Sequence, residues 1–162
     1  MESMTNDERK LAEAYISLLT TINIGIEELL GPASKGLIFN MGVEEGRRLA
    51  EKMKKTNALI PALRELNEAY EGVWSIEAKK NGGNDSYFYE DDLGQPSFNI
   101  MVRQCPVRSA VREKNMDQCG PICYLTNGYL AGMLEGLMGE KVGMEILHAG
   151  FLACKKRIYF RK

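Results

Sequence analysis

The residues best suited to chemistry gather in one stretch near the C-terminal end of the chain. It holds all four cysteines and the only histidine. Thiolate and imidazole are the ligands that zinc prefers, and structural zinc sites usually contain a pair of ligands roughly two to four residues apart. The spacing Cys119-x3-Cys123 fits this pattern. The stretch therefore predicts a zinc site, and its candidate ligands are Cys123, Cys154, Cys119, Cys105 and His148.

Two other uses of the same residues stay open. A cysteine beside a histidine can act as an activated nucleophile, and Glu145 is the only nearby group to orient such a histidine. Cysteines can also be small apolar core residues without chemistry. Phosphate-binding loops, dinucleotide fingerprints and the His-Glu-x-x-His and Gly-x-Ser-x-Gly motifs are absent from the sequence. We therefore favour a binding role over an enzymatic one.

The composition is that of a soluble globular protein. The chain has 162 residues, of which 44% are hydrophobic and 27% are charged, and its net charge is −1. This balance provides no broad positive field to attract nucleic acid or anionic lipid. No apolar run approaches the roughly 18 residues that a membrane span needs, and the first residues lack a signal-peptide pattern. We expect a cytoplasmic protein with reduced thiols and with no nucleic-acid or membrane partner.

The elements that must position these residues begin with three helices. Apolar residues recur at three- and four-residue steps over 11–30, over 34–55 and over 59–70. Glycines in the second of these segments indicate that something packs closely against it, or that a ligand needs space there. These glycines are Gly36, Gly42 and Gly46.

At Gly72 the helical period gives way to alternation. Strands are expected over 73–78, 87–89 and 98–103, joined by turns at 81–84 and 90–96, and two closing strands over 143–149 and 153–160. The acidic run in the second turn could hold a cation. A solvated turn is the favoured interpretation, because no calcium-loop spacing surrounds it.

Two further helices are expected between the third and fourth strands. The first, over 107–115, carries Arg108 and Arg112 close to Arg103. These three cations could bind an anion, but their acidic neighbours favour a solvated face. The second, over 122–138, has glycines at regular four-residue steps, which places it close against the sheet or against a second copy of the chain. These glycines are Gly128, Gly132 and Gly136.

The order of these elements contains no strand-helix repeat, so the expected fold class is α+β. We expect one domain over 1–162, with a twisted antiparallel sheet of four or five strands covered by helices. The apolar helix surface over 11–30 and 34–53 exceeds what one small sheet can cover. This excess predicts a helix-mediated homodimer.

The chain resembles the vinyl-4-reductase domain family of predicted hydrocarbon-binding proteins in archaea and bacteria. The resemblance covers about 31–160, outside the N-terminal helix over 1–30. It rests on Cys105-Pro106, on Pro121-Ile122-Cys123 before a helix, and on Glu145 followed by Gly150-x3-Cys154.

One cysteine of the family pattern is missing from the closing hairpin. Family members usually carry it at the position that Ile146 occupies here. His148 lies two residues further on, on the same face of a regular strand, and could replace the lost ligand. Cys119 is the other candidate for that role.

The resemblance implies a fold shared with transport-particle tethering subunits and haem nitric-oxide sensor domains, often dimeric and with an apolar pocket. It implies a binding or sensing module for a small apolar or tetrapyrrole-like ligand, with zinc at the cysteines. The namesake vinyl reduction is not carried over, because the sequence offers no hydride carrier. A metal- or thiol-dependent enzyme at the same cysteines and a structural dimerising protein are the alternatives.

Overall fold

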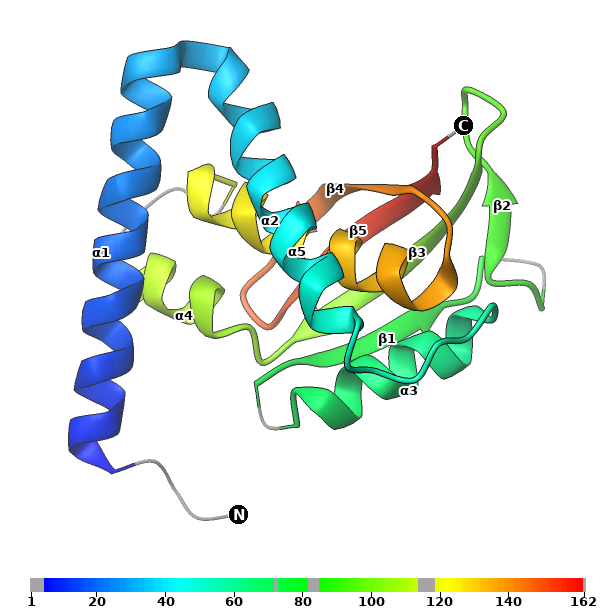
Figure 1. The fold of residues 1–162 in the computed structure, drawn as a ribbon, viewed down its shortest axis with the longest axis horizontal. Helices are drawn as coiled ribbons and strands as arrows, with labels where there is room; N and C mark the ends of the chain where they lie inside the picture. The colour runs from blue at the N-terminus through cyan, green and yellow to red at the C-terminus, as the bar shows by residue number, and fades with distance from the viewer. Residues whose placement is uncertain (1–4, 72, 82–84, 114–118, 162) are drawn as a thin grey trace.

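An open antiparallel sheet of five strands with helices packed against it forms the body of the molecule (Figure 1). This computed structural model describes residues 5–71, 73–81, 85–113 and 119–161. Three features expected from the sequence lie wholly or partly outside these ranges. They are the change of period at Gly72, the centre of the turn at 81–84 and the last residues of the helix over 107–115.

The elements confirm the expected α+β class and most of the expected ranges. The helices are α1 (Asn6–Leu30), the 3-10 turn η1 (Gly31–Ala33), α2 (Ser34–Ala50), α3 (Leu59–Ala69), α4 (Pro106–Glu113) and α5 (Pro121–Met138). The strands are β1 (Ser75–Lys79), β2 (Phe88–Glu90), β3 (Pro96–Arg103), β4 (Val142–Ala149) and β5 (Ala153–Phe160). Several bounds differ from expectation by a few residues. Helix α2 ends at Ala50 instead of residue 55, and Pro96 begins β3 instead of closing the turn, at a strand position where a missing N–H is tolerated.

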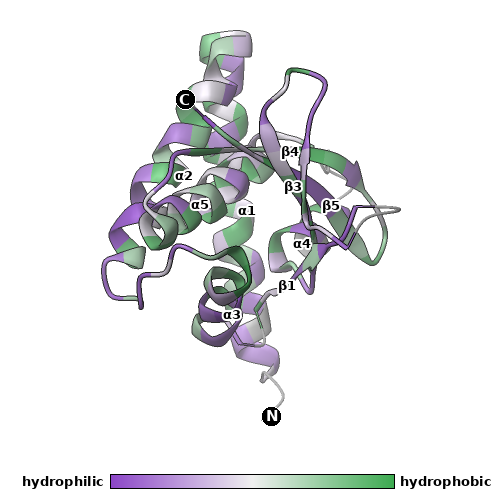
Figure 2. Ribbon diagram, turned by 90° about the vertical axis from the view of Figure 1, so that its right-hand side faces the viewer, coloured by the Kyte–Doolittle hydropathy of each residue, from purple (hydrophilic) through white to green (hydrophobic). Residues whose placement is uncertain are grey.

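The sheet has the strand order β1-β3-β5-β4, and β2 pairs with the first residues of β3. All of these pairs are antiparallel. Side chains alternate along β3, so that Phe98, Ile100 and Val102 are buried on one face. Helices α2, α3 and α5 lie on that side of the sheet (Figure 2).

Helix α5 packs between α2 and the sheet, in backbone contact with α2. A Cβ atom at Gly128 or Gly132 would overlap a backbone carbonyl of α2, and one at Gly42 or Gly46 would overlap a backbone carbonyl of α5. The glycine stripe of α5 therefore serves a contact within the chain. It faces α2, and not the sheet or a second copy as the sequence had suggested.

A buried carboxylate fastens the same helix to its other neighbours. Glu135 of α5 accepts hydrogen bonds from the Arg47 Nε at 2.7 Å, from the backbone N–H of Val142 at 2.9 Å and from Arg161 at 3.1 Å. These donors come from α2, from the start of β4 and from the residue after β5. One side chain thus joins three parts of the fold around α5.

The close contact between α2 and α5 predicts a large difference between two glycine substitutions. Gly132→Ala should lower the free energy of unfolding by about 1–3 kcal/mol, because its Cβ meets the Val43 carbonyl, which cannot move away as a flexible side chain can. Gly36→Ala is the matched control on α2, since no described atom lies within 4 Å of a Cβ built there. It should raise stability by up to about 1 kcal/mol through helix propensity. Urea unfolding of both variants checks this, and equal effects would refute the close contact.

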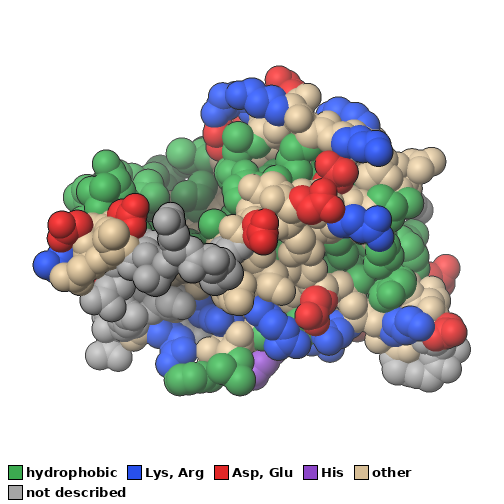
Figure 3. Space-filling view, turned by 90° about the horizontal axis from the view of Figure 1, so that it is seen from below, with side chains coloured by type: hydrophobic (Ala, Val, Ile, Leu, Met, Phe, Trp, Pro, Cys, Tyr) green, Lys and Arg blue, Asp and Glu red, His purple; other side chains and the backbone are tan. Residues whose placement is uncertain are grey.

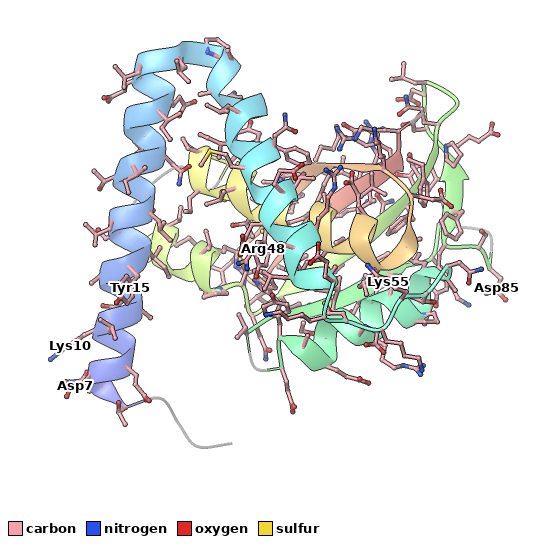
Figure 4. The ribbon with its side chains drawn as sticks, in the orientation of Figure 1. Asp7, Lys10, Tyr15, Arg48, Lys55 and Asp85 are labelled. Atoms are coloured by element: carbon pink, nitrogen blue, oxygen red, sulfur yellow. The ribbon has the colours of Figure 1, made fainter. Side chains whose placement is uncertain are left out.

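Helix α1 carries its apolar side chains on the outside. Its two buried residues among those described are the polar Thr20 and Asn23, whose side chains bond to carbonyls of their own helix. By contrast, Leu18 is 62% exposed and Ile22 is 59% exposed. Figure 3 shows hydrophobic side chains exposed at the end of the molecule that carries α1, and Figure 4 shows Tyr15 on the part of α1 that lies apart from the sheet. Within the described ranges, no helix is both long and apolar enough to span a bilayer.

The exposed residues of α1 follow the spacing of a coiled-coil seam. Steps of alternately four and three residues connect Leu11, Tyr15, Leu18, Ile22, Gly25 and Leu29. A seam of this period is complementary to a second helix that carries the same repeat. The most direct source of such a helix is another copy of the chain, so the homodimer expected from the sequence stays a prediction, now assigned to α1.

Disrupting this seam should separate the copies without unfolding either. We expect the wild-type chain to run near twice its mass of 18.2 kDa in light scattering at micromolar concentration. The double variant Leu18→Glu, Ile22→Glu should run as a monomer with an unchanged circular dichroism spectrum, because two carboxylates on the seam cannot be desolvated cheaply. Lys10→Glu, exposed and outside both the seam and its flanking positions, is the control and should stay dimeric. A monomeric wild-type chain would overturn the prediction.

Candidate functional site

Three of the four cysteines line one small enclosed cavity. Cys105 enters it from the end of β3, Cys123 from the first turn of α5 and Cys154 from β5. The structure therefore brings together three of the five residues that the sequence singled out. Cys119 and His148 are exposed and are not among the described residues that line the cavity.

Local backbone geometry explains why these residues converge. Cys154 pairs with Val102 across the sheet, which puts its side chain on the helix-covered face beside the end of β3. Gln104 then adopts a left-handed conformation with φ of 52°, so that the chain leaves the strand and Cys105 is buried. Burial raises the pKa of the Cys123 thiol to about 12.

His148 is separated from the cavity by an irregularity in β4. The register between β4 and β5 shifts between Ile146 and His148, as in a β-bulge. Ile146 lines the cavity, whereas His148 pairs with Lys155 and is exposed. The expectation that these two residues share a face assumed a regular strand. The Cys-His nucleophile considered as an alternative therefore gains no support from the geometry.

The cavity contains a buried lysine that the sequence analysis did not identify. Lys156 is 4% exposed and lies on the inner face of β5, between Ile100 of β3 and Ile146 of β4. Its Nζ donates to the Oδ1 of Asn127 on α5 at 2.6 Å, and burial lowers its pKa. The available signal was the alternation along β5, which puts Lys156 on the same face as the cysteine two residues before it.

A second buried cation lines the cavity from α4. Arg108 is 7% exposed, and its Nε and Nη1 atoms are buried without a hydrogen-bond partner among the described residues. The prediction of a solvated position is therefore wrong for Arg108. The prediction holds for Arg103, which lies 3.5 Å from Glu77 on the surface, and for Arg112, which stacks on Phe151.

The cavity is small and has mixed walls. The centre of a water molecule can occupy a volume of about 10 Å³ inside it. A cavity of this volume holds about one water molecule. Apolar side chains of Val102, Val107 and Ile146 alternate with the thiols, the Thr126 hydroxyl and the two cations.

These residues do not form a ligand set that fits zinc. Among the described residues, no group of three or more His, Cys, Asp or Glu side chains is placed to hold a metal ion. Ile146 stands where the family resemblance requires a cysteine, and a buried guanidinium and a buried amine face the same space. A divalent cation there would face the Arg108 charge in a poorly solvated site. The zinc prediction gains no support from this arrangement.

A second polar feature lies inside the core, among three aromatic rings. Trp74 packs against Tyr70 and Tyr129, with ring centroids 5.1 and 5.8 Å away. The two tyrosine hydroxyls share a hydrogen bond of 2.6 Å, and burial together with this bond raises the pKa of Tyr129 well above its usual range. The indole N–H of Trp74 is buried and has no acceptor among the described residues.

The comparisons with known proteins identify the fold. No family model matches the chain, and no curated protein matches it. Among solved structures, the chain is similar in fold to the phenol-responsive sensory domain of the transcription activator PoxR, crystallised with phenol. The identity is 19%, the TM-score is 0.61, and the match covers 90% of this chain and 74% of that chain. At this identity the likeness shows the fold alone, and the vinyl-4-reductase resemblance is not confirmed.

The placement of the cysteines predicts their reactivity toward a disulfide reagent such as Ellman's. The exposed Cys119 should react fast and the three cavity thiols slowly. For Cys123, a pKa of about 12 instead of 9 lowers the thiolate fraction about a thousandfold. Cys119→Ser should remove the fast phase, and a chelator should leave the slow phases unchanged. Two or more fast thiols per chain would contradict the placement.

Proposed function

We propose that this chain is a binding or sensing module for a small, mainly apolar molecule of about the size of phenol. The observation that carries the proposal is the buried indole N–H of Trp74, which has no acceptor among the described residues. A buried donor without a partner costs about 1–3 kcal/mol. A ligand oxygen that accepts from Trp74 would recover this free energy.

The surroundings of Trp74 suit an aromatic ligand that carries a hydroxyl group. The rings of Tyr70 and Tyr129 supply apolar surface with defined edge and face geometry. Their hydroxyl pair provides both a donor and an acceptor beside the indole. A protein of the same fold, the PoxR sensory domain, is phenol-responsive and was crystallised with phenol, which supports this choice of ligand class. A tetrapyrrole-like ligand stays a prediction of the sequence resemblance.

The chain supplies its own reporter for this proposal, because Trp74 is its only tryptophan. Titration of the full chain with phenol should change the Trp74 emission in a saturable manner, when excitation is at the red edge where phenol does not absorb. Tyr129→Phe removes one hydroxyl beside the indole and should weaken phenol binding by up to about tenfold, the worth of one hydrogen bond.

Tyr89→Phe is the matched control for this experiment. Its hydroxyl donates to Asn99 Oδ1 at 3.0 Å, away from the aromatic cluster, so its loss should leave phenol binding unchanged. Trp74→Phe, followed by calorimetry because the reporter is lost, should bind phenol more weakly than wild type. If calorimetry and emission both show no response to millimolar phenol, the proposal fails for this ligand class.

A further inference from the structure

Two basic side chains share the cavity of the cysteines, and neither meets an acidic side chain among the described residues that line it. Arg108 enters from α4 and Lys156 from β5, and both are more than nine-tenths buried. Among the described residues that line the cavity there is no aspartate or glutamate. Because a guanidinium is not deprotonated in proteins, at least the Arg108 charge is buried without a counter-ion from these walls.

The hydrogen bonds of these two groups are incomplete. Lys156 donates to Asn127, but an amine nitrogen has further N–H groups to place. The Arg108 guanidinium is less well satisfied, because its Nε and Nη1 are closed to solvent and have no acceptor among the described residues. Burying an unpaired charge costs several kcal/mol. An acceptor that carries negative charge would satisfy both groups at once.

The backbone adds to the positive potential of the cavity. Helix α4 begins at Pro106, and Val107 and Arg108 of its first turn line the cavity. The first N–H groups of a helix lack partners within the helix, and its N-terminal end carries partial positive charge. The N-terminal end of α4, the Arg108 guanidinium and the Lys156 amine therefore all favour a negatively charged ligand.

We propose that this cavity binds one monatomic monovalent anion, of the size of chloride, between Arg108 and Lys156. The volume of about 10 Å³, about that of one water molecule, excludes polyatomic anions. The thiols of Cys105, Cys123 and Cys154 and the Thr126 hydroxyl form the rest of its shell. The anion site is independent of the proposed phenol site, since different residues build the two.

The first test measures stability as one anion replaces another at constant ionic strength. The full chain is unfolded by heat in sodium gluconate, whose anion is too large for the cavity, and then with chloride in its place. Wild type should show a saturable rise of the midpoint, about 2–4 °C when the anion is at about four times its dissociation constant.

Two variants on one helix make this test specific. Arg108→Met removes the buried charge, so it should lose the response to chloride and be at least as stable as wild type in gluconate. Arg112→Met, four residues further along α4 and stacked on Phe151 at the surface, should keep the wild-type response. If Arg108→Met does not fold, Lys156→Met provides the second variant and should weaken the response.

Diffraction from wild-type crystals grown with bromide locates the ion directly. Anomalous scattering should show one bromide within hydrogen-bond distance of Arg108 and Lys156. Stability that is the same in chloride and gluconate, together with no bromide in the cavity, would overturn the proposal. One equivalent of zinc bound to the three cavity cysteines, or a thiolate absorption showing that a cysteine is the counter-ion, would also overturn it. Retention of the phenol response by Arg108→Met would show that the two proposals stand or fall separately.

Discussion

The contact between the backbones of α2 and α5 is the constraint on which the rest of the structure depends. Glycines on both helices remove the side chains that would hold them apart, and α5 then lies between α2 and the sheet. A helix covered on both sides has little solvated surface for polar groups. The buried polar residues of α5 therefore find hydrogen-bond partners inside the protein, and these residues are Thr126, Asn127 and Glu135.

Much of the fold was predictable because periodicity records which face of an element is buried. The helices and strands lie close to the expected ranges, and the antiparallel sheet was expected because the order of elements contains no strand-helix repeat. The partner of the glycine stripe was not predictable. Glycine spacing reports that a backbone approaches, but the identity of that backbone depends on the matching Gly42 and Gly46, which are distant in sequence.

The sequence analysis identified the thiols of the candidate site but did not identify its buried basic residues. Cys105, Cys123 and Cys154 do converge, but the residues that set the electrostatics of the cavity are Arg108 and Lys156. Basic residues are mostly exposed in proteins, and Lys156 stands between Lys155 and Arg157 in the sequence, so a solvated position was the natural interpretation. The alternation along β5 was a signal for Lys156, but no comparable signal in the sequence indicates that Arg108 is buried. The bulge that turns His148 outward is also invisible in the sequence, because it depends on the register with the partner strand.

Among the described residues, the indole N–H of Trp74 and the guanidinium of Arg108 are buried donors without acceptors. The indole N–H of Trp74 is neutral, so its partner needs only a lone pair, and the aromatic surroundings favour a largely apolar ligand. The guanidinium of Arg108 is charged, so a neutral ligand would leave most of its burial cost in place. A single small molecule that satisfies one of these groups is therefore poorly suited to the other. The interior is better explained by two separate occupants than by one.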